Sequence, residues 1–165
     1  MSLIVEDGTG LSTAEVYSSL EDFKAYRPRG GLTIPTGTTD PNLESALIRG
    51  TAFADAAFPW PGIKYAEGQA LAWPREYAYD LSNYYLEGVP TCVKYLCMEA
   101  ALIELATPGA LSLALERGGK KIRSKTGPIE DEWSPSAPGA TVYPILRQCV
   151  RSIVTGSGVM KFGRG

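Results

Sequence analysis

The stretch from Val89 to Thr107 constrains the fold most strongly, because its apolar residues recur at three- and four-residue steps. Such spacing gives one broad apolar stripe on an α-helix. Pro90 suits the first helical turn, and Pro108-Gly109 ends the helix. The stripe consists of Val93, Leu96, Cys97, Ala100, Ile103 and Leu105. Burial of each side chain is worth roughly 1.5 to 3 kcal/mol, so we expect the core helix here and expect Ala100→Asp to unfold the protein.

A second core helix is predicted from Asp40-Pro41 up to Pro59. Apolar residues follow at helical spacing through this segment, and a proline at its start fits the first turn. Gly50 lies within the apolar stripe. A missing side chain there lets another helix come close, although glycine costs about 1 kcal/mol in helix propensity.

Four shorter segments complete the predicted helical pattern. Ser19 can cap a helix that turns Phe23 and Tyr26 inward, and Pro144 opens a last helix whose apolar side extends to Val154. The other two are a short helix from Glu67 to Trp73 and a weak helix from Leu111 to Leu115. We interpret the tyrosine-rich residues 77–88 as an irregular segment that packs on the central helix.

The segment 120–133 alternates in the manner of a β-hairpin, with Gly127-Pro128 at the bend. Two facing sets of charges can pair across its strands; they are Lys121, Arg123 and Lys125 on one strand, and Glu130 and Glu132 on the other. The expected fold is mainly α, a small helical bundle of about four helices with this hairpin inserted. Residues 1–11 form an extended N-terminal arm, residues 156–165 a C-terminal tail, and 1–165 a single domain.

The composition argues against catalysis. The chain has no histidine, which removes the commonest general base and metal ligand near neutral pH. Cys92, Cys97 and Cys149 lie in helical patterns, where cysteine acts as a small apolar residue. Gly118-Gly119-Lys120-Lys121 lacks the spacing of a phosphate-binding loop. We therefore expect no catalytic residues, no cofactor and no metal site, in a soluble chain without a signal peptide or a membrane segment.

Two features are candidates for nucleic-acid contact. Five basic residues between Arg117 and Lys125 could neutralise phosphates, although an ordinary charged hairpin explains them better. Tyrosines could stack on bases, as in proteins that bind single strands, but acidic Asp80 and Glu87 accompany them and packing is the favoured interpretation. These tyrosines are Tyr77, Tyr79, Tyr84 and Tyr85. The net charge of -2 gives no general attraction to nucleic acid.

Several local strings resemble one phage protein family. They are LIVEDGTGL at 3–11 with Tyr17 and Tyr26, ALAWPR at 70–75, Val89-Pro90, Gly127-Pro128-Ile129 and Tyr143-Pro144. Members of this family are often labelled DnaT-like single-stranded-DNA-binding proteins. The same strings resemble the head-tail connector, or adaptor, proteins of tailed phages. That resemblance implies a homo-oligomeric ring, typically dodecameric, at the head-tail junction of the virion, assembled in the host cytoplasm.

Of these two functions, the connector is the one that the sequence favours, because loops, a hairpin and a loose tail suit an interlocking ring subunit. Its implied partners are the portal protein, a stopper or tail-completion protein, and DNA that passes through the ring without sequence specificity, with no membrane. Portal or neighbour contacts are assigned to Arg147, Arg151, Met160, Lys161, Phe162 and Arg164. Contacts of the hairpin with a neighbour, the stopper or DNA are assigned to Lys120, Lys121, Arg123, Lys125, Glu130 and Glu132. The alternative function is a primosome-like replication protein that binds single-stranded DNA.

Overall fold

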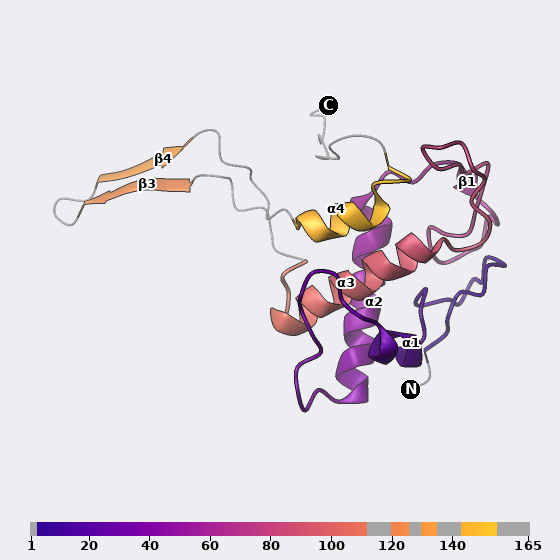
Figure 1. The fold of residues 1–165 in the computed structure, drawn as a ribbon, viewed down its shortest axis with the longest axis horizontal. Coiled ribbons are helices and arrows are strands. Elements are labelled where there is room, and N and C mark those ends of the chain that lie inside the picture. The colour runs from indigo at the N-terminus through magenta and orange to yellow at the C-terminus, as the bar shows by residue number, and fades with distance from the viewer. Residues whose placement is uncertain (1–2, 112–119, 126–129, 135–142, 155–165) are drawn as a thin grey trace.

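The computed structural model describes residues 3–111, 120–125, 130–134 and 143–154. Within these ranges the chain is mainly helical, with four helices and two small antiparallel ladders (Figure 1). The helices are α1 (Leu20–Ala25), α2 (Asp40–Ala57), α3 (Thr91–Ala106) and α4 (Pro144–Val150). The strands are β1 (Ile63–Lys64), β2 (Arg75–Glu76), β3 (Lys120–Lys125) and β4 (Glu130–Ser134). The predicted fold class is confirmed.

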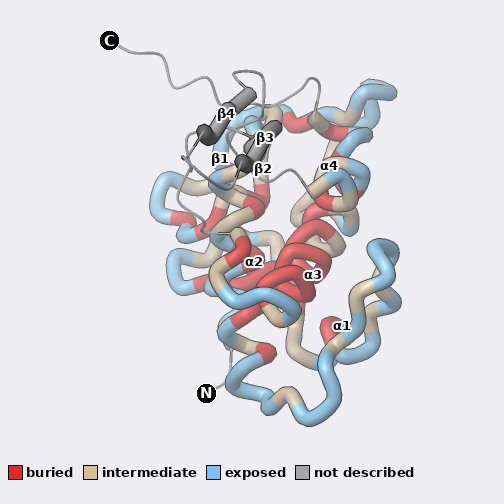
Figure 2. Tube along the Cα trace, turned by 90° about the vertical axis from the view of Figure 1, so that its left-hand side faces the viewer, coloured by how far each residue is buried: buried red, intermediate tan, exposed pale blue. Residues whose placement is uncertain are grey.

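Helix α3 is the centre of the core, as its apolar periodicity predicts. Ten of its residues, all between Val93 and Glu104, are buried. Figure 2 shows α3 as the most continuously buried element. Helix α2 packs across it and α4 packs on its other side (Figure 1). At Gly50 of α2 an added Cβ would lie 2.5 Å from the carbonyl oxygen of Cys97. The predicted close approach at Gly50 is therefore confirmed.

The helix ends follow local chemistry. The Ser19 hydroxyl accepts a hydrogen bond from the Asp22 N–H at 3.0 Å, which confirms it as the cap of α1. Pro90 has extended backbone and is the N-cap of α3, and the helix begins at Thr91. Pro90 therefore precedes the first turn, although the sequence predicts it within that turn. Helix α4 ends at Val150 rather than reaching Val154, yet Ile153 in the following turn is still buried.

The predicted helix from Glu67 to Trp73 is wrong. Residues 67–68 form a turn and residues 70–72 form bends, so no helix is present, and Leu71 and Trp73 are buried from irregular backbone. In place of helical backbone bonds, the Gln69 side chain forms hydrogen bonds with backbone groups of this segment. Its amide nitrogen donates to the carbonyl oxygens of Leu71 and Pro74, at 2.8 and 3.0 Å, and its oxygen accepts from the Ala66 N–H at 2.9 Å.

Residues 3–11 are extended at Val5, which forms a parallel bridge with Val16, but they are held against the body. Glu6 is 2% exposed, and its carboxylate accepts from the N–H groups of Gly8, Gly10 and Leu11, each at 2.9 Å. A carboxylate that receives several backbone N–H groups fixes the loop around it. This part of the predicted arm is thus an ordered loop.

Two more buried glutamates organise loops from α3. Glu99 Oε1 accepts from the Tyr26 hydroxyl at 3.0 Å and from the Arg29 N–H at 2.6 Å. Glu104 accepts from the N–H groups of Gly109 and Leu111, each at 2.9 Å, and its Oε2 lies 3.2 Å from Arg49 Nε. Both side chains are about as buried as the apolar residues of the core. The segments before α2 and after α3 are therefore attached to the central helix by charge-assisted hydrogen bonds.

The predicted hairpin is confirmed, with β3 antiparallel to β4 (Figure 1). Arg123 is opposite Glu132 and Lys125 is opposite Glu130, as the charge pattern predicts. The register shifts between Lys121 and Arg123, so Ile122 interrupts the regular alternation. The predicted helix 111–115, apart from Leu111 in a turn, and the tail 156–165 lie outside the described residues.

Candidate nucleic-acid interface

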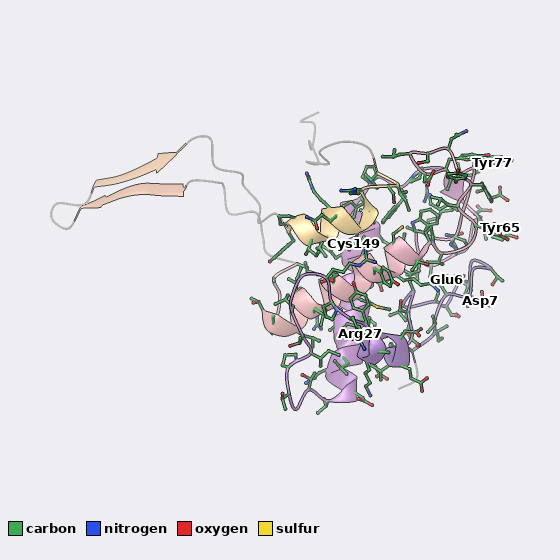
Figure 3. All side chains as sticks on the ribbon, in the orientation of Figure 1. Glu6, Asp7, Arg27, Tyr65, Tyr77 and Cys149 are labelled. Carbon is green, nitrogen blue, oxygen red and sulfur yellow. The ribbon has the colours of Figure 1, made fainter. Side chains whose placement is uncertain are left out.

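Five exposed tyrosines lie in the loops between α2 and α3, and the prediction that the four tyrosines of residues 77–88 pack on the central helix is wrong, although Ala78 and Leu86 of that segment do pack on the core. Tyr77 and Tyr84 are 68% and 72% exposed, and the other three are 45% to 53% exposed. Two exposed aliphatic residues accompany them. We call this set the tyrosine surface; it consists of Ile63, Tyr65, Tyr77, Tyr79, Leu81, Tyr84 and Tyr85. Figure 3 shows Tyr65 and Tyr77 at the same end of the molecule. A packed aromatic segment would not present so much ring area to solvent.

Arg75 holds together the part of the surface around β1 and β2. Its guanidinium donates to the carbonyl oxygens of Pro61, Ala72 and Gly62, at 2.6, 3.1 and 2.7 Å. Partial burial lowers the pKa of Arg75, and the Asp55 carboxylate opposes that shift. Arg75 therefore acts as a brace for the backbone that carries Tyr65 and Tyr77, and most of its hydrogen-bonding capacity is used within the protein.

A buried polar pair attaches the same loop to α2. The Tyr17 hydroxyl donates to Asp55 Oδ1 at 2.7 Å and accepts from the Trp73 N–H at 2.9 Å. Asp55 Oδ2 accepts from the Ala72 N–H at 2.8 Å. Burial raises the pKa of Asp55, although these two donors and nearby Lys64 and Arg75 partly counter it. These hydrogen bonds fix the backbone of residues 72 and 73, close to β2 and the tyrosine surface.

Residues 79–85 form a tight turn. Tyr79 and Tyr85 make an antiparallel bridge, and their rings lie 5.6 Å apart at an angle of 65°. Asp80 Oδ1 accepts from the N–H groups of Ser82 and Tyr84, at 2.9 and 2.8 Å, and the Asp80 N–H donates to the Tyr84 carbonyl oxygen at 2.9 Å. Such an Asx-type turn fixes the backbone on which Tyr84 stands.

This turn is joined to the end of α4. The Leu81 N–H donates to the carbonyl oxygen of Ser152 at 2.8 Å, and Ser152 follows exposed Arg151, the C-cap of α4. Of the basic residues predicted to bind partners, Arg151 is therefore placed beside the tyrosine surface, whereas Arg147 is half-buried on α4. Sequence reasoning gave no reason to bring residue 151 and residues 79–85 together.

The remaining predicted contact residues divide into two groups. The hairpin residues Lys120, Lys121, Arg123, Lys125, Glu130 and Glu132 are on paired strands, with the backbone register given above. Met160, Lys161, Phe162 and Arg164 lie outside the described residues. Tyr65, Ile63 and Leu81 were missed, because isolated apolar residues in loops follow no periodicity that would indicate exposure.

Other chemistry is sparse in the described ranges. No group of three or more Cys, Asp or Glu side chains could hold a metal ion there, and no described helix is long and apolar enough to cross a membrane. Burial raises the pKa of Cys92, Cys97 and Cys149, the last to about 11 with the Glu99 carboxylate adding to the effect. The thiols are therefore protonated at neutral pH, as expected of small apolar side chains.

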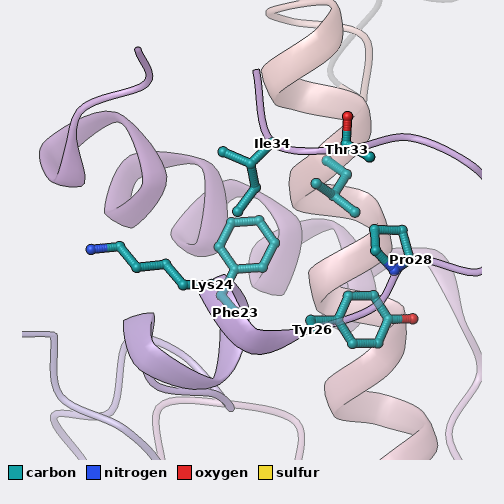
Figure 4. Close-up of a pocket in the computed structure, with 7 residues that line it drawn as sticks. Phe23, Lys24, Tyr26, Pro28, Thr33 and Ile34 are labelled. Carbon is teal, nitrogen blue, oxygen red and sulfur yellow. The ribbon is translucent and has the colours of Figure 1, made fainter. Parts of the chain in front are cut away.

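A cavity of about 210 Å³ lies between α1, the loop after it and α3 (Figure 4). Its lining is mostly apolar and consists of Phe23, Lys24, Tyr26, Pro28, Thr33, Ile34 and Leu102. Two of its polar groups are already engaged, because Lys24 pairs with Asp40 at 2.6 Å and the Tyr26 hydroxyl donates to Glu99. The cavity offers much less distinctive chemistry than the tyrosine surface.

The described residues thus form a small helical body with aromatic rings exposed on loops that side-chain hydrogen bonds hold in place. The chain belongs to the protein family described as "Putative DnaT-like ssDNA binding protein", whose model matches residues 1–165. The predicted resemblance to that family is confirmed. Neither the curated proteins nor the solved structures contain a match.

Proposed function

We propose that this chain binds single-stranded DNA by stacking bases on the tyrosine surface. The observation that carries the proposal is the exposure of Tyr77 and Tyr84, at 68% and 72%, on backbone that other residues brace. Every base has a flat face that can stack on an aromatic ring, so such binding tolerates any sequence. The description of the family supports the same ligand.

The charge distribution suggests how this binding would depend on salt. Residues 60–88 carry Lys64 and Arg75 against four carboxylates, Glu67, Glu76, Asp80 and Glu87. Few phosphates can be neutralised on such a surface, so stacking must supply most of the affinity. Since each phosphate contact with a single strand contributes about 0.7 to the salt slope, we expect a shallow slope of roughly one to three units.

The proposal is tested by fluorescence anisotropy with labelled single-stranded oligonucleotides of about 20 nucleotides, with the matching duplex as comparison. The double variant Tyr77→Leu/Tyr84→Leu removes two rings and keeps two apolar side chains, and we expect it to lose most of the affinity. Tyr77→Phe/Tyr84→Phe keeps the rings and should bind like the wild type. Absence of single-strand binding by the wild type at low salt would refute the proposal.

The basic strand β3 gives a separate arm of this test. Replacing Lys121, Arg123 and Lys125 by Ala should reduce the salt slope by about two units if this strand contacts phosphates, at about 0.7 per contact. Unchanged affinity and slope would assign DNA binding to the tyrosine surface alone. In either case the chain acts by binding, and we propose no catalytic activity for it.

A head-tail connector subunit is the second candidate, and one observation favours it. Ile63 and Leu81 are 57% and 56% exposed beside the tyrosines, and tyrosine-rich apolar patches with few cations are common at protein interfaces. In this proposal the same surface joins subunits of a ring, dodecameric in the related connectors, between portal and stopper at the head-tail junction of the virion. DNA would pass through the ring without being bound tightly.

Native mass spectrometry and negative-stain imaging, with and without portal protein, separate the two candidates. A ring subunit should assemble, and Ile63→Asp/Leu81→Asp should abolish assembly because it places charges in an apolar interface. A chain that remains monomeric with portal, yet binds single strands, would exclude the connector role for this surface.

A further inference from the structure

We infer that the turn 80–84 and Arg151 form a nucleotide subsite, in which a base stacks on Tyr84, Arg151 contacts a neighbouring phosphate, and Asp80 is the residue that positions Tyr84. The inference rests on the proposed binding of single-stranded DNA and assigns particular roles within that surface. It gives an acidic side chain a favourable role in binding a polyanion, which is the opposite of what its charge alone predicts.

Tyr84 has the geometry of a stacking platform. It is the most exposed of the five tyrosines, whereas Tyr79 and Tyr85 on either side of the turn have rings in contact with each other. Its backbone is held at both polar groups, since its N–H donates to Asp80 Oδ1 and its carbonyl oxygen accepts from the Asp80 N–H. A ring on fixed backbone loses little conformational freedom when a base stacks on it.

Asp80 maintains this conformation. Its carboxylate oxygen receives two N–H groups across the turn, and its own carbonyl oxygen accepts from the Asn83 N–H at 2.9 Å. Asn83 is in the left-handed region with φ of +67°, a conformation that asparagine tolerates better than most residues. Without the Asp80 carboxylate the turn would keep only its backbone hydrogen bonds, which would hold Asn83 and Tyr84 less firmly.

Arg151 supplies the complementary charge. It precedes Ser152, whose carbonyl oxygen accepts from the Leu81 N–H at 2.8 Å, and its side chain is exposed. A guanidinium is well suited to phosphate because it presents several donors in one plane. The backbone bond between residues 81 and 152 keeps the backbone of Arg151 next to the turn that carries Tyr84.

The two roles of Asp80 predict opposite effects for two substitutions that remove the same charge. Asp80→Asn keeps an oxygen acceptor for the turn and removes the repulsion of phosphate, so single-strand affinity should equal or exceed that of the wild type. Asp80→Ala removes the acceptor as well, so affinity should fall about fivefold or more, as expected when stacking on one base is lost. If charge alone mattered, both variants would bind more tightly.

The experiment measures affinity for a labelled 20-nucleotide single strand by anisotropy, at several salt concentrations, for the full chain and its variants. Tyr84→Leu should weaken binding by about 5- to 150-fold, and Asp80→Ala should have no further effect in that background. Arg151→Ala should lower the salt slope by about 0.7, with partial recovery in Arg151→Lys, while Arg147→Ala serves as the matched control with an unchanged slope.

The outcomes distinguish this inference from the function on which it rests. Tighter binding by both Asp80 variants, or an Asp80→Ala effect that persists without Tyr84, would overturn the positioning role. Wild-type binding that is insensitive to Tyr84→Leu and Arg151→Ala would overturn the subsite while leaving single-strand binding intact. Failure of the wild type to bind any single strand would instead reject the proposed function.

Discussion

Gly50 of α2 faces the Cys97 carbonyl of α3 so closely that an added Cβ would lie 2.5 Å from that oxygen and 2.9 Å from the Ala101 nitrogen. Both neighbours are main-chain atoms of the central helix, which cannot move aside as a flexible side chain can. The two helices therefore have to separate if residue 50 acquires a side chain.

Gly50→Ala should destabilise the protein by about 1 to 3 kcal/mol, because overpacking outweighs the gain in helix propensity. Urea unfolding followed by circular dichroism measures the change. Ala52→Gly, at an exposed position of the same helix, is the matched control and should cost about 1 kcal/mol. Stabilisation by Gly50→Ala would show that α2 and α3 are less close than described.

Glu104 makes stability depend on pH below its ordinary pKa of 4.5. Burial alone raises the pKa of Glu104, but the N–H groups of Leu111 and Gly109, together with Arg49, outweigh burial and lower it overall. The folded state therefore binds this proton less tightly than the unfolded state. The stabilisation is present above pH 4.5 and is lost as the pH falls through the lower folded pKa.

Glu104→Gln should remove this dependence. The variant should be less stable than the wild type at pH 7 by about 1 to 3 kcal/mol, because an amide cannot accept from donors on both sides, and the difference should shrink toward pH 3. Urea midpoints across that range measure both effects. Asp40→Asn, which affects an exposed pair with Lys24, should change stability by at most about 1 kcal/mol.

The helical core could be predicted from the sequence because it depends on periodicity and on end signals. Three features of the core are indicated by local sequence patterns and are present in the fold. They are the apolar stripe of α3, the N-cap at Ser19 and the close helix approach at Gly50. The opposite charges that face each other across the hairpin were predictable from the alternation of Lys, Arg and Glu, whereas the register shift between Lys121 and Arg123 was not.

The loops could not be predicted in this way. Glu99 and Glu104 have the usual surface character of glutamate, and only the loops that return to α3 explain their burial. Likewise, tyrosine is equally suited to a core and to a surface, so residues 77–85 gave no local indication of exposure. The contact between Leu81 and Ser152 joins segments about 70 positions apart in the chain, and no spacing rule covers such a pair.

Tyr17→Phe should loosen the support of the tyrosine surface. It leaves the buried Trp73 N–H and Asp55 Oδ1 without their partner, at a cost of about 1 to 3 kcal/mol in the free energy of unfolding. The hydrogen bond from the Tyr17 hydroxyl lowers the pKa of Asp55 against the effect of burial, so its removal should cost more stability at pH 7 than at pH 3. Urea unfolding at both pH values measures this, and exposed Tyr79→Phe is a control expected to change stability by less than about 0.5 kcal/mol.

Ala100→Asp should unfold the protein. Ala100 is completely buried on α3, in the core cluster that includes Leu96 and Ile103. A carboxylate there would have neither space nor a partner, and burial of an unpaired charge costs several kcal/mol, comparable with the whole stability of a small domain. The circular dichroism spectrum at pH 7 should lose most of its helical signal. Thr91→Asp adds the same side chain at the exposed first residue of α3, where the helix dipole favours it by about 0.3 to 1 kcal/mol, so this variant should fold as well as the wild type.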